Sequence, residues 1–357
     1  MAYFVIFAVA FLASAALTPL ARWLSLRWGV VARPGGRRQH EGTIPKLGGI
    51  PLLGALLLAT AVIYTLIPPP DARDQHLLTG ILLGTLVIFA GGLLDDWLDL
   101  PPWAQFVIYF AGTAVAMSFT VFIERFRNPL PTGTIWETGF LAFFFTLEAP
   151  EVVLLPWFIW VVTLFWIVGM LNTVNFLDGL DGLATGVGAI AALMFAWHSY
   201  QIALQTGQFT VAAFPLALAG ALLGFLPFNF APARIFLGSA GAYLLGYQLA
   251  TLAIIAPAKI ATALLVMAVP ILDVAWQIVD RLRRGQSPLR GDRGHLHFRL
   301  SDGGLPTRRI VLGYYAVSLA FGLVAIFAPT PLIKLVMLLV LATAVLLLLV
   351  LLSRRTQ

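Results

Sequence analysis

One polar stretch, residues 172–186, lies between two long apolar runs and has the residue types best suited to chemistry. It reads Asn-Thr-Val-Asn-Phe-Leu-Asp-Gly-Leu-Asp-Gly-Leu-Ala-Thr-Gly. Asp178 and Asp181 are three residues apart, so one helical turn would direct both carboxylates the same way. Gly179 and Gly182 would let a ligand approach the backbone closely. The stretch therefore has the composition of a ligand site.

Two interpretations of this stretch are open. Two carboxylates, followed by the free amide groups of a helix that starts near Leu183, suit a divalent cation that carries a polyphosphate. The alternative is a structural turn in which an aspartate caps the helix. Ionised carboxylates near a bilayer are costly and tend to be functional, which favours the first interpretation.

A second acidic group follows another apolar run. Asp95 and Asp96 are adjacent, and Asp99 comes about a turn later. Two like charges this close raise the pKa of one of them, which suits a general base or a metal site. The alternative is a pair of solvated acids, but acids at a helix C-terminus oppose the helix dipole. We expect Asp95 and Asp96 to be functional and Asp99 to be solvated or paired.

Two other loops contain groups that suit phosphate or a nucleobase. The glycine-rich loop at 33–49 contains Lys46, which could meet phosphate, although a basic patch touching anionic lipid is equally consistent. In the loop at 228–241, Asn229 could read the amide edge of a base while Phe236 stacks on it. For Phe236 alone, ordinary packing is the more frequent role.

The loop at 281–309 has six residues that can bind phosphate: Arg284, Arg290, Arg293, His295, His297 and Arg299. The two histidines also have a spacing found in metal sites. No thiol or third imidazole accompanies them, so anion binding is favoured over zinc. For the arginines alone, a solvated basic loop is the alternative.

Composition decides which class of protein must position these residues. The chain has 357 residues, 60% of them hydrophobic and only 11% charged, with a mean hydropathy of +0.92. A soluble domain would be about 25% charged. The sequence therefore predicts an integral membrane protein, and helices rather than a barrel because no run of alternating strands occurs. It contains no cysteine, so a disulfide framework is excluded.

We expect an all-α, polytopic protein of about 11 transmembrane helices, each of roughly 17–25 residues. The expected spans lie near residues 2–21, 48–67, 77–94, 103–123, 152–171, 183–204, 209–227, 240–256, 259–279, 310–328 and 332–352. No soluble domain fits between them. A single transmembrane domain, 1–357, with its active site on the loops is therefore predicted.

Basic residues set the expected orientation. The loops after odd-numbered spans and the C-terminal tail hold 17 of the 22 Lys and Arg residues, and the same loops hold the polar motifs. Cytoplasmic loops carry such an excess. We expect the N-terminus outside, the C-terminus in the cytoplasm and the motifs on the cytoplasmic face of the inner membrane. The first apolar run has no basic residue before Arg22, so it is interpreted as a retained span rather than a signal peptide.

Together, five loops resemble those of the polyprenyl-phosphate N-acetylhexosamine-1-phosphate transferase family. The matching pieces are Pro-x-x-Gly-Gly at 45–49, the acid pair at 95–96, residues 172–184, residues 232–241 and His-x-His at 295–297. The pattern is similar to bacterial enzymes that move GlcNAc-1-phosphate from UDP-GlcNAc onto undecaprenyl phosphate and release UMP. The three consecutive histidines and acid of the muramyl-pentapeptide branch are missing, which argues against that substrate.

The resemblance implies roles for individual residues. It implies catalytic roles for Asp95, Asp96, Asp178, His295 and His297. It implies substrate contacts from Lys46, Asn172, Asn175, Asn229, Phe236, Arg290, Arg293 and Arg299. Magnesium, or manganese in its place, would be bound by Asp178, Asp181 and the residue at position 239. A homodimer and a place at the first membrane step of a cell-envelope glycan pathway are compatible with it; nucleic acid is not expected.

Two positions depart from the family pattern. Phe298 stands where a third histidine is usual, and Ser239 stands where the family normally has an aspartate ligand. Serine is neutral and a poorer ligand for a hard cation. The sequence therefore predicts weakened magnesium binding and low or no transferase activity.

Two alternatives remain open. One is a non-enzymatic transporter or lipid-phosphate carrier with polar sites at broken helices. Against it, the acids cluster at one membrane face, and only Asp273 lies well inside an expected span, where it would face the bundle. The other is a family member that uses a different UDP-N-acetylhexosamine. Release of UMP would separate an enzyme from a transporter.

Overall fold

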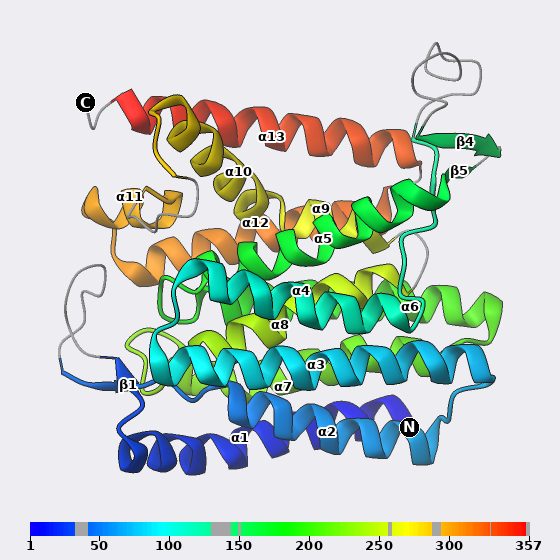
Figure 1. Ribbon diagram of the computed structural model, residues 1–357, viewed down its shortest axis with the longest axis horizontal. Helices are drawn as coiled ribbons and strands as arrows, with labels where there is room; N and C mark the ends of the chain where they lie inside the picture. Colours follow the sequence, from blue (N-terminus) through cyan, green and yellow to red (C-terminus); the bar gives the residue numbers. More distant parts are fainter. Residues whose placement is uncertain are drawn as a thin grey trace.

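The computed structural model describes residues 1–32, 42–129, 144–148, 151–255, 259–287, 294–328 and 330–354. These residues form a helical bundle with two small sheets (Figure 1). The first seven helices are α1 (Ala2–Trp28), α2 (Gly49–Leu66), α3 (Ala72–Leu98), α4 (Pro102–Ser118), α5 (Pro156–Leu177), α6 (Leu183–Thr206) and α7 (Phe209–Asn229). The others are α8 (Gly238–Ile254), α9 (Lys259–Val266), α10 (Ala268–Arg283), α11 (Leu296–Asp302), α12 (Thr307–Phe327) and α13 (Pro331–Arg354).

The described helices confirm a multi-pass, all-α membrane protein. Eight of them are long and apolar enough to cross a membrane: α1, α2, α3, α5, α6, α7, α12 and α13. The bent pair α9 and α10 would make nine. Helices α4 and α8 coincide with two further expected spans but have only 17 residues each. The count of 11 and the orientation of the termini therefore stay predictions.

The expected span at 259–279 is bent in the structure. The chain forms two helices there, α9 and α10, which meet at 75° around Met267. Pro270 explains the break, because it has no amide proton to donate to the carbonyl four residues back, and its ring crowds that carbonyl. The bend places Asp273 on a helix that runs toward the motif end of the bundle.

Helix α8 is the centre of the bundle, packed against α3, α5 and α2. Every residue from Ala240 to Ala253 is buried. Small residues on the neighbouring helices permit this enclosure: a Cβ on Gly92 of α3 would lie 2.6 Å from the Cα of Ala240. Close backbone approach through small residues is how helices pack in membranes. The start of α8 is thereby fixed against the end of α3.

The described parts of the loops that carry the motifs lie at one end of the bundle, at the left in Figure 1, which is also where the described chain ends. Strands β1 (Val31–Ala32) and β2 (Ile44–Pro45) pair antiparallel there. The opposite end holds the N-terminus and a second sheet of β3 (Arg125–Arg127), β5 (Glu151–Leu154) and β4 (Phe145–Glu148). The predicted clustering of the polar motifs on one side is thus seen in the arrangement of the helices.

Candidate active site

The acidic stretch at 178–182 is a tight connection between α5 and α6. Asp178 is the C-terminal cap of α5, and Gly182 precedes α6 with φ of 80°. Glycine suits Gly182 because that backbone conformation is left-handed. Tyr315 of α12 donates its hydroxyl to the carbonyl of Gly182, and its ring leaves no room for a Cβ on Gly186. Helix α12 therefore holds the connection in place.

The same connection touches the segment that contains His295 and His297, called the histidine segment below. A Cβ on Gly179 would lie 2.4 Å from Nε2 of His297 and 2.8 Å from the Phe298 ring. Gly179 is therefore needed for close packing against another part of the protein, and the approach of a ligand to this glycine stays a prediction. Two motifs that are far apart in the chain meet here.

Asp181 and Asn229 both help to hold the segment after α7. Oδ2 of Asp181 accepts a hydrogen bond from the Ala233 amide at 2.8 Å. Asn229 is buried; its Oδ1 accepts from the Thr185 hydroxyl at 2.7 Å, and its Nδ2 donates to the Ile235 carbonyl at 3.0 Å. Both ends of the Asn229 amide are thus engaged inside the protein. In this conformation they support the loop, and recognition of a base by Asn229 stays a prediction.

Asp96 anchors the start of α8. Its two carboxylate oxygens accept from the amides of Ser239 and Ala240, each at 2.9 Å. These amides belong to the first turn of α8, where a helix has no partners of its own and attracts negative charge. Gly238 precedes them with φ of 74°, and a Cβ there would meet the Lys46 carbonyl at 2.0 Å. The helix start, Asp96 and the Lys46 loop therefore form one packed unit.

Asp95 has different partners from its neighbour. It accepts from the Tyr243 hydroxyl at 2.8 Å, the Leu100 amide at 2.9 Å and Nε2 of Gln105 at 3.3 Å. The two adjacent carboxylates thus serve separate hydrogen-bond networks, and each is already well supplied with donors. Asp99 is exposed and lies 3.4 Å from the Lys46 ammonium, as expected for a solvated or paired acid.

Of the four described motif acids Asp95, Asp96, Asp178 and Asp181, Asp178 has the least hydrogen-bond support. Within the described part of the chain no hydrogen bond reaches its carboxylate, whereas Asp96 and Asp181 both act on it electrostatically. Burial, followed by repulsion from Asp96 and then Asp181, holds the pKa of Asp178 well above its usual value. An acid destabilised in this way is a natural partner for a cation or a proton.

The carboxylate oxygens of this region are ligands of the kind that magnesium prefers. Mg²⁺ is commonly held by one or two carboxylates and by the phosphates of a substrate, and Asp178 has oxygens that no described group occupies. Among the described residues no three acidic or histidine side chains converge into an ion site made of protein alone. Ser239 lies beside Asp96 at the start of α8, where its amide is bonded. A metal role for position 239 stays a prediction.

The two histidines are buried side by side in the segment before and within α11. Their rings are stacked with centroids 5.8 Å apart. His295 also lies against Phe176 of α5 at 4.8 Å, and Nδ1 of His295 is 3.0 Å from Oδ2 of Asp273. Asp273 therefore faces the bundle interior, as expected, and it has a specific partner that the sequence did not suggest.

The remaining predicted residues are placed as follows. Asn172 and Asn175 are partly buried on the last turns of α5. Arg299 donates Nε to the Gly294 carbonyl at 2.6 Å. Phe236 is bonded through its backbone to the Lys46 loop, with its amide donating to Pro45 at 2.8 Å. Arg290 and Arg293 lie outside the described residues.

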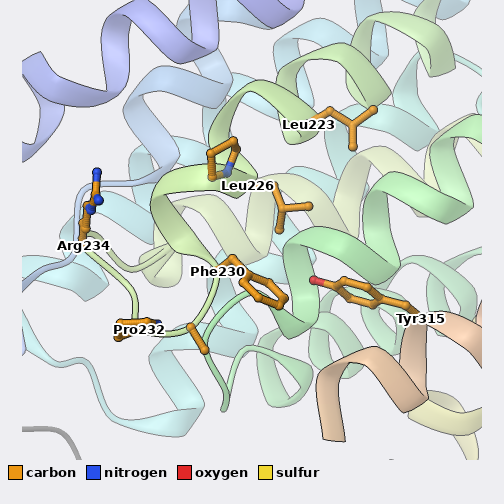
Figure 2. Close-up of a pocket in the computed structure, with 8 residues that line it drawn as sticks. Leu223, Leu226, Phe230, Pro232, Arg234 and Tyr315 are labelled. Atoms are coloured by element: carbon orange, nitrogen blue, oxygen red, sulfur yellow. The ribbon is translucent and has the colours of Figure 1, made fainter. Parts of the chain in front are cut away.

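A cavity of about 480 Å³ opens at the end of α7. Its walls are apolar residues at the end of α7, the segment from Phe230 to Arg234, and Tyr315 (Figure 2). Figure 2 shows the Phe230 ring and the Tyr315 side chain on the same side of the cavity, with Arg234 at the opposite edge. The cavity adjoins the acidic connection, because Tyr315 lines the cavity and bonds the Gly182 carbonyl.

Several residues of this region carried no local signal in the sequence. Tyr243, Gln105 and Tyr315 lie within apolar runs and belong to none of the polar motifs. Only the three-dimensional packing shows that they bond Asp95 or the Gly182 carbonyl. Asp273 did have a signal, because an acid within an apolar span is rarely without a role.

The chain is similar in sequence to several known transferases. A probable undecaprenyl-phosphate N-acetylglucosaminyl 1-phosphate transferase of Bacillus subtilis is 29% identical over 330 residues, covering 90% of this chain and 84% of the relative. A decaprenyl-phosphate N-acetylglucosaminephosphotransferase of Mycolicibacterium smegmatis is 33% identical, covering 84% and 75%. A phospho-N-acetylmuramoyl-pentapeptide-transferase of Geobacillus kaustophilus is 31% identical, covering 90% and 95%.

The family model described as glycosyl transferase family 4 matches residues 78–257. The matched range begins in α3, before the Asp95–Asp96 pair, and ends after α8, so it includes the acidic connection and the start of α8. The resemblance noted in the loop motifs is confirmed by these comparisons. This chain belongs to glycosyl transferase family 4, and the relatives it resembles are named as phosphosugar transferases, two of them for a polyprenyl phosphate.

Proposed function

We propose that the protein transfers GlcNAc-1-phosphate from UDP-GlcNAc to undecaprenyl phosphate and releases UMP. One observation carries the proposal: the acidic connection touches the histidine segment at Gly179 and His297. This contact brings carboxylates suited to a cation together with imidazoles suited to an anion. A site where two phosphates meet needs both kinds of group, because it must offset their mutual repulsion. Family membership and the names of the relatives support the reaction class.

In the proposed reaction, an oxygen of the lipid phosphate forms a bond to the phosphorus that carries the sugar. The bond from that phosphorus to the bridging oxygen breaks, and UMP leaves with the bridging oxygen. The acceptor phosphate is already a competent nucleophile, so positioning matters more than activation. Direct attack is therefore favoured over a two-step route through an aspartyl intermediate. The carboxylates of Asp95 and Asp96 already accept hydrogen bonds from Tyr243 and from the amide of Ser239. We therefore assign them to positioning the surrounding segments rather than to removing a proton.

Magnesium is the proposed cofactor, with manganese as its substitute. When bound, the ion would stabilise negative charge on the transferring group. Asp178 and Asp181 would hold it, and donor phosphates would complete its shell. Lys46, which is buried near Asp96, would add positive charge at the same end of the bundle.

The histidine segment supports UDP-GlcNAc over the muramyl-pentapeptide donor. The relatives include enzymes named for each kind of substrate, so overall identity does not choose between them. Here the motif is His-Leu-His-Phe, and the Phe298 ring packs on His297 at 4.3 Å. The segment therefore lacks the run of three consecutive histidines that is typical of the muramyl-pentapeptide branch. We place the site at the cytoplasmic face of the inner membrane, in agreement with the bias of basic residues.

The test is a donor panel with purified protein in detergent, undecaprenyl phosphate and Mg²⁺. UMP release should occur with UDP-GlcNAc and not with UDP-N-acetylmuramyl-pentapeptide. Asp178→Asn serves as the negative control. Because Ser239 predicts low activity, Ser239→Asp is assayed in parallel. Absence of UMP release from both forms with every UDP-N-acetylhexosamine would refute the proposal and favour a carrier.

A further inference from the structure

Asp273 and His295 form a buried pair outside the loops that carry the acidic motifs. Asp273 is on α10, and His295 immediately precedes α11. Asp273 is 3% exposed and His295 is 2% exposed. The separation of 3.0 Å between Nδ1 of His295 and Oδ2 of Asp273 is that of a hydrogen bond. An ionised carboxylate can only accept, so Nδ1 must carry the proton.

The other oxygen of Asp273 fixes the backbone of the same segment. Oδ1 accepts from the Leu296 amide at 2.9 Å. Gln277, one turn further along α10, donates its side chain to the Gly294 carbonyl. One face of α10 therefore holds both the backbone and the ring of His295.

The opposite edge of the ring has no such partner. Nε2 of His295 is buried and, within the described residues, has no hydrogen bond. Buried polar atoms are rarely left unsatisfied, so an atom of this kind calls for a ligand or another specific reason. The ring lies between Phe176, two residues before Asp178, and His297, which touches Gly179. The ring of His295 is therefore held close to the acidic connection.

From this arrangement we infer that Asp273 is a positioning residue for His295, which it holds with the proton on Nδ1 so that Nε2 faces the phosphates of the donor. The inference rests on the proposed function and adds a residue to it. Asp273 acts through His295 and does not itself touch the substrate. Carboxylates that orient a histidine in this manner set both its tautomer and its rotation.

Asp273→Asn separates this role from simple support of the loop. The amide oxygen of Asn can still accept from Leu296, so the backbone contact is kept. Its NH₂ group would then face Nδ1, which must become an acceptor, and the ring proton moves to Nε2. We expect kcat to fall about 100-fold while KM for UDP-GlcNAc changes less than about threefold, as in other sites where the partner of a histidine is removed.

A matched control is available on α12. Tyr314 interacts electrostatically with Asp273, but its hydroxyl has no hydrogen bond within the described residues. Tyr314→Phe should therefore leave kcat and KM unchanged. Asp273→Glu restores the carboxylate and should recover part of the lost kcat, which a purely structural loss would not do.

Two measurements complete the test. In the double variant Asp273→Asn/His295→Gln, kcat should be no lower than in His295→Gln alone, because Asp273 acts only through the ring. Multiplicative losses would overturn the inference. The ¹⁵N NMR shifts of His295, assigned with His295→Gln among the five histidines, should show Nδ1 protonated in the parent and Nε2 protonated in Asp273→Asn. An unchanged tautomer would also overturn it.

The NMR result does not depend on turnover. If no donor releases UMP but the tautomer changes as expected, the proposed reaction fails while the pairing of Asp273 and His295 stands. If UMP is released and Asp273→Asn retains parental kcat, the reaction stands and the positioning role fails.

Discussion

The double hydrogen bond of Asp96 to the start of α8 predicts a measurable loss of stability when its charge is removed. In Asp96→Asn, one oxygen remains to accept from Ser239 or Ala240, and the NH₂ group faces the other amide. One charge-assisted hydrogen bond, worth about 1.5–3 kcal/mol, is lost. The favourable interaction of the charge with the helix start, about 1 kcal/mol, is lost with it. Because Asp96 is 4% exposed, solvent cannot compensate.

These gains sum to about 3 kcal/mol, but burial of the carboxylate and its repulsion of Asp178 oppose them. We therefore expect a net loss of about 1–2 kcal/mol, which for a chain of this size corresponds to a fall in the unfolding temperature of roughly 2–4 °C. Thermal unfolding is followed by tryptophan fluorescence in one detergent at a fixed scan rate, because unfolding of such proteins is commonly irreversible. Hydrogen exchange at the amides of 239–240 should accelerate at the same time, which locates the effect at α8.

Asp99→Asn is the matched control, since its side chain is 76% exposed and its only described ion pair is with Lys46. It should unfold within about 1 °C of the parent, as exposed pairs contribute little. If Asp96→Asn loses activity but unfolds with the parent and keeps slow exchange at 239–240, anchoring of α8 by Asp96 is refuted. Asp96 would then be a purely chemical group.

Three further outcomes are expected. Because the pKa of Asp178 is raised, its ionisation destabilises the fold as pH rises above the ordinary value of 3.8. Asp178→Asn should therefore unfold at a higher temperature than the parent at pH 8 without divalent cations, and this gain should disappear near pH 3. Equal unfolding temperatures at pH 8 would contradict this expectation. Tyr315→Phe removes the hydrogen bond to the Gly182 carbonyl and should lower the free energy of unfolding by about 1 kcal/mol. The control is Tyr3→Phe, which removes a similar bond to the Phe209 carbonyl at the other end of the bundle. Only the Tyr315 variant should weaken UDP-GlcNAc binding measured by calorimetry. Ser239→Asp should increase magnesium-dependent UMP release and lower the magnesium concentration needed for half-maximal activity, since a charged ligand is added; full activity of the Ser239 form at low magnesium would show that position 239 is not a needed ligand.

The sequence by itself determined the class of protein and the set of polar motifs. Hydropathy and the scarcity of charge require helices that lie in a bilayer, because backbone groups there must be satisfied within each helix. Spacing alone also placed the acidic connection between two helices, and the structure has α5 ending at Leu177 and α6 beginning at Leu183. These properties are local, so a linear reading can recover them.

The tertiary structure decided what each polar group bonds. Asp95 and Asp96 are adjacent in the chain, yet one bonds Tyr243 and the other the start of α8, because α8 is enclosed by its neighbours. The partner of His295 comes from a helix that begins after a bend at Met267, which apolar composition alone did not predict. Such partners are set by how helices pack, and packing depends on shape complementarity between segments distant in sequence rather than on local residue patterns.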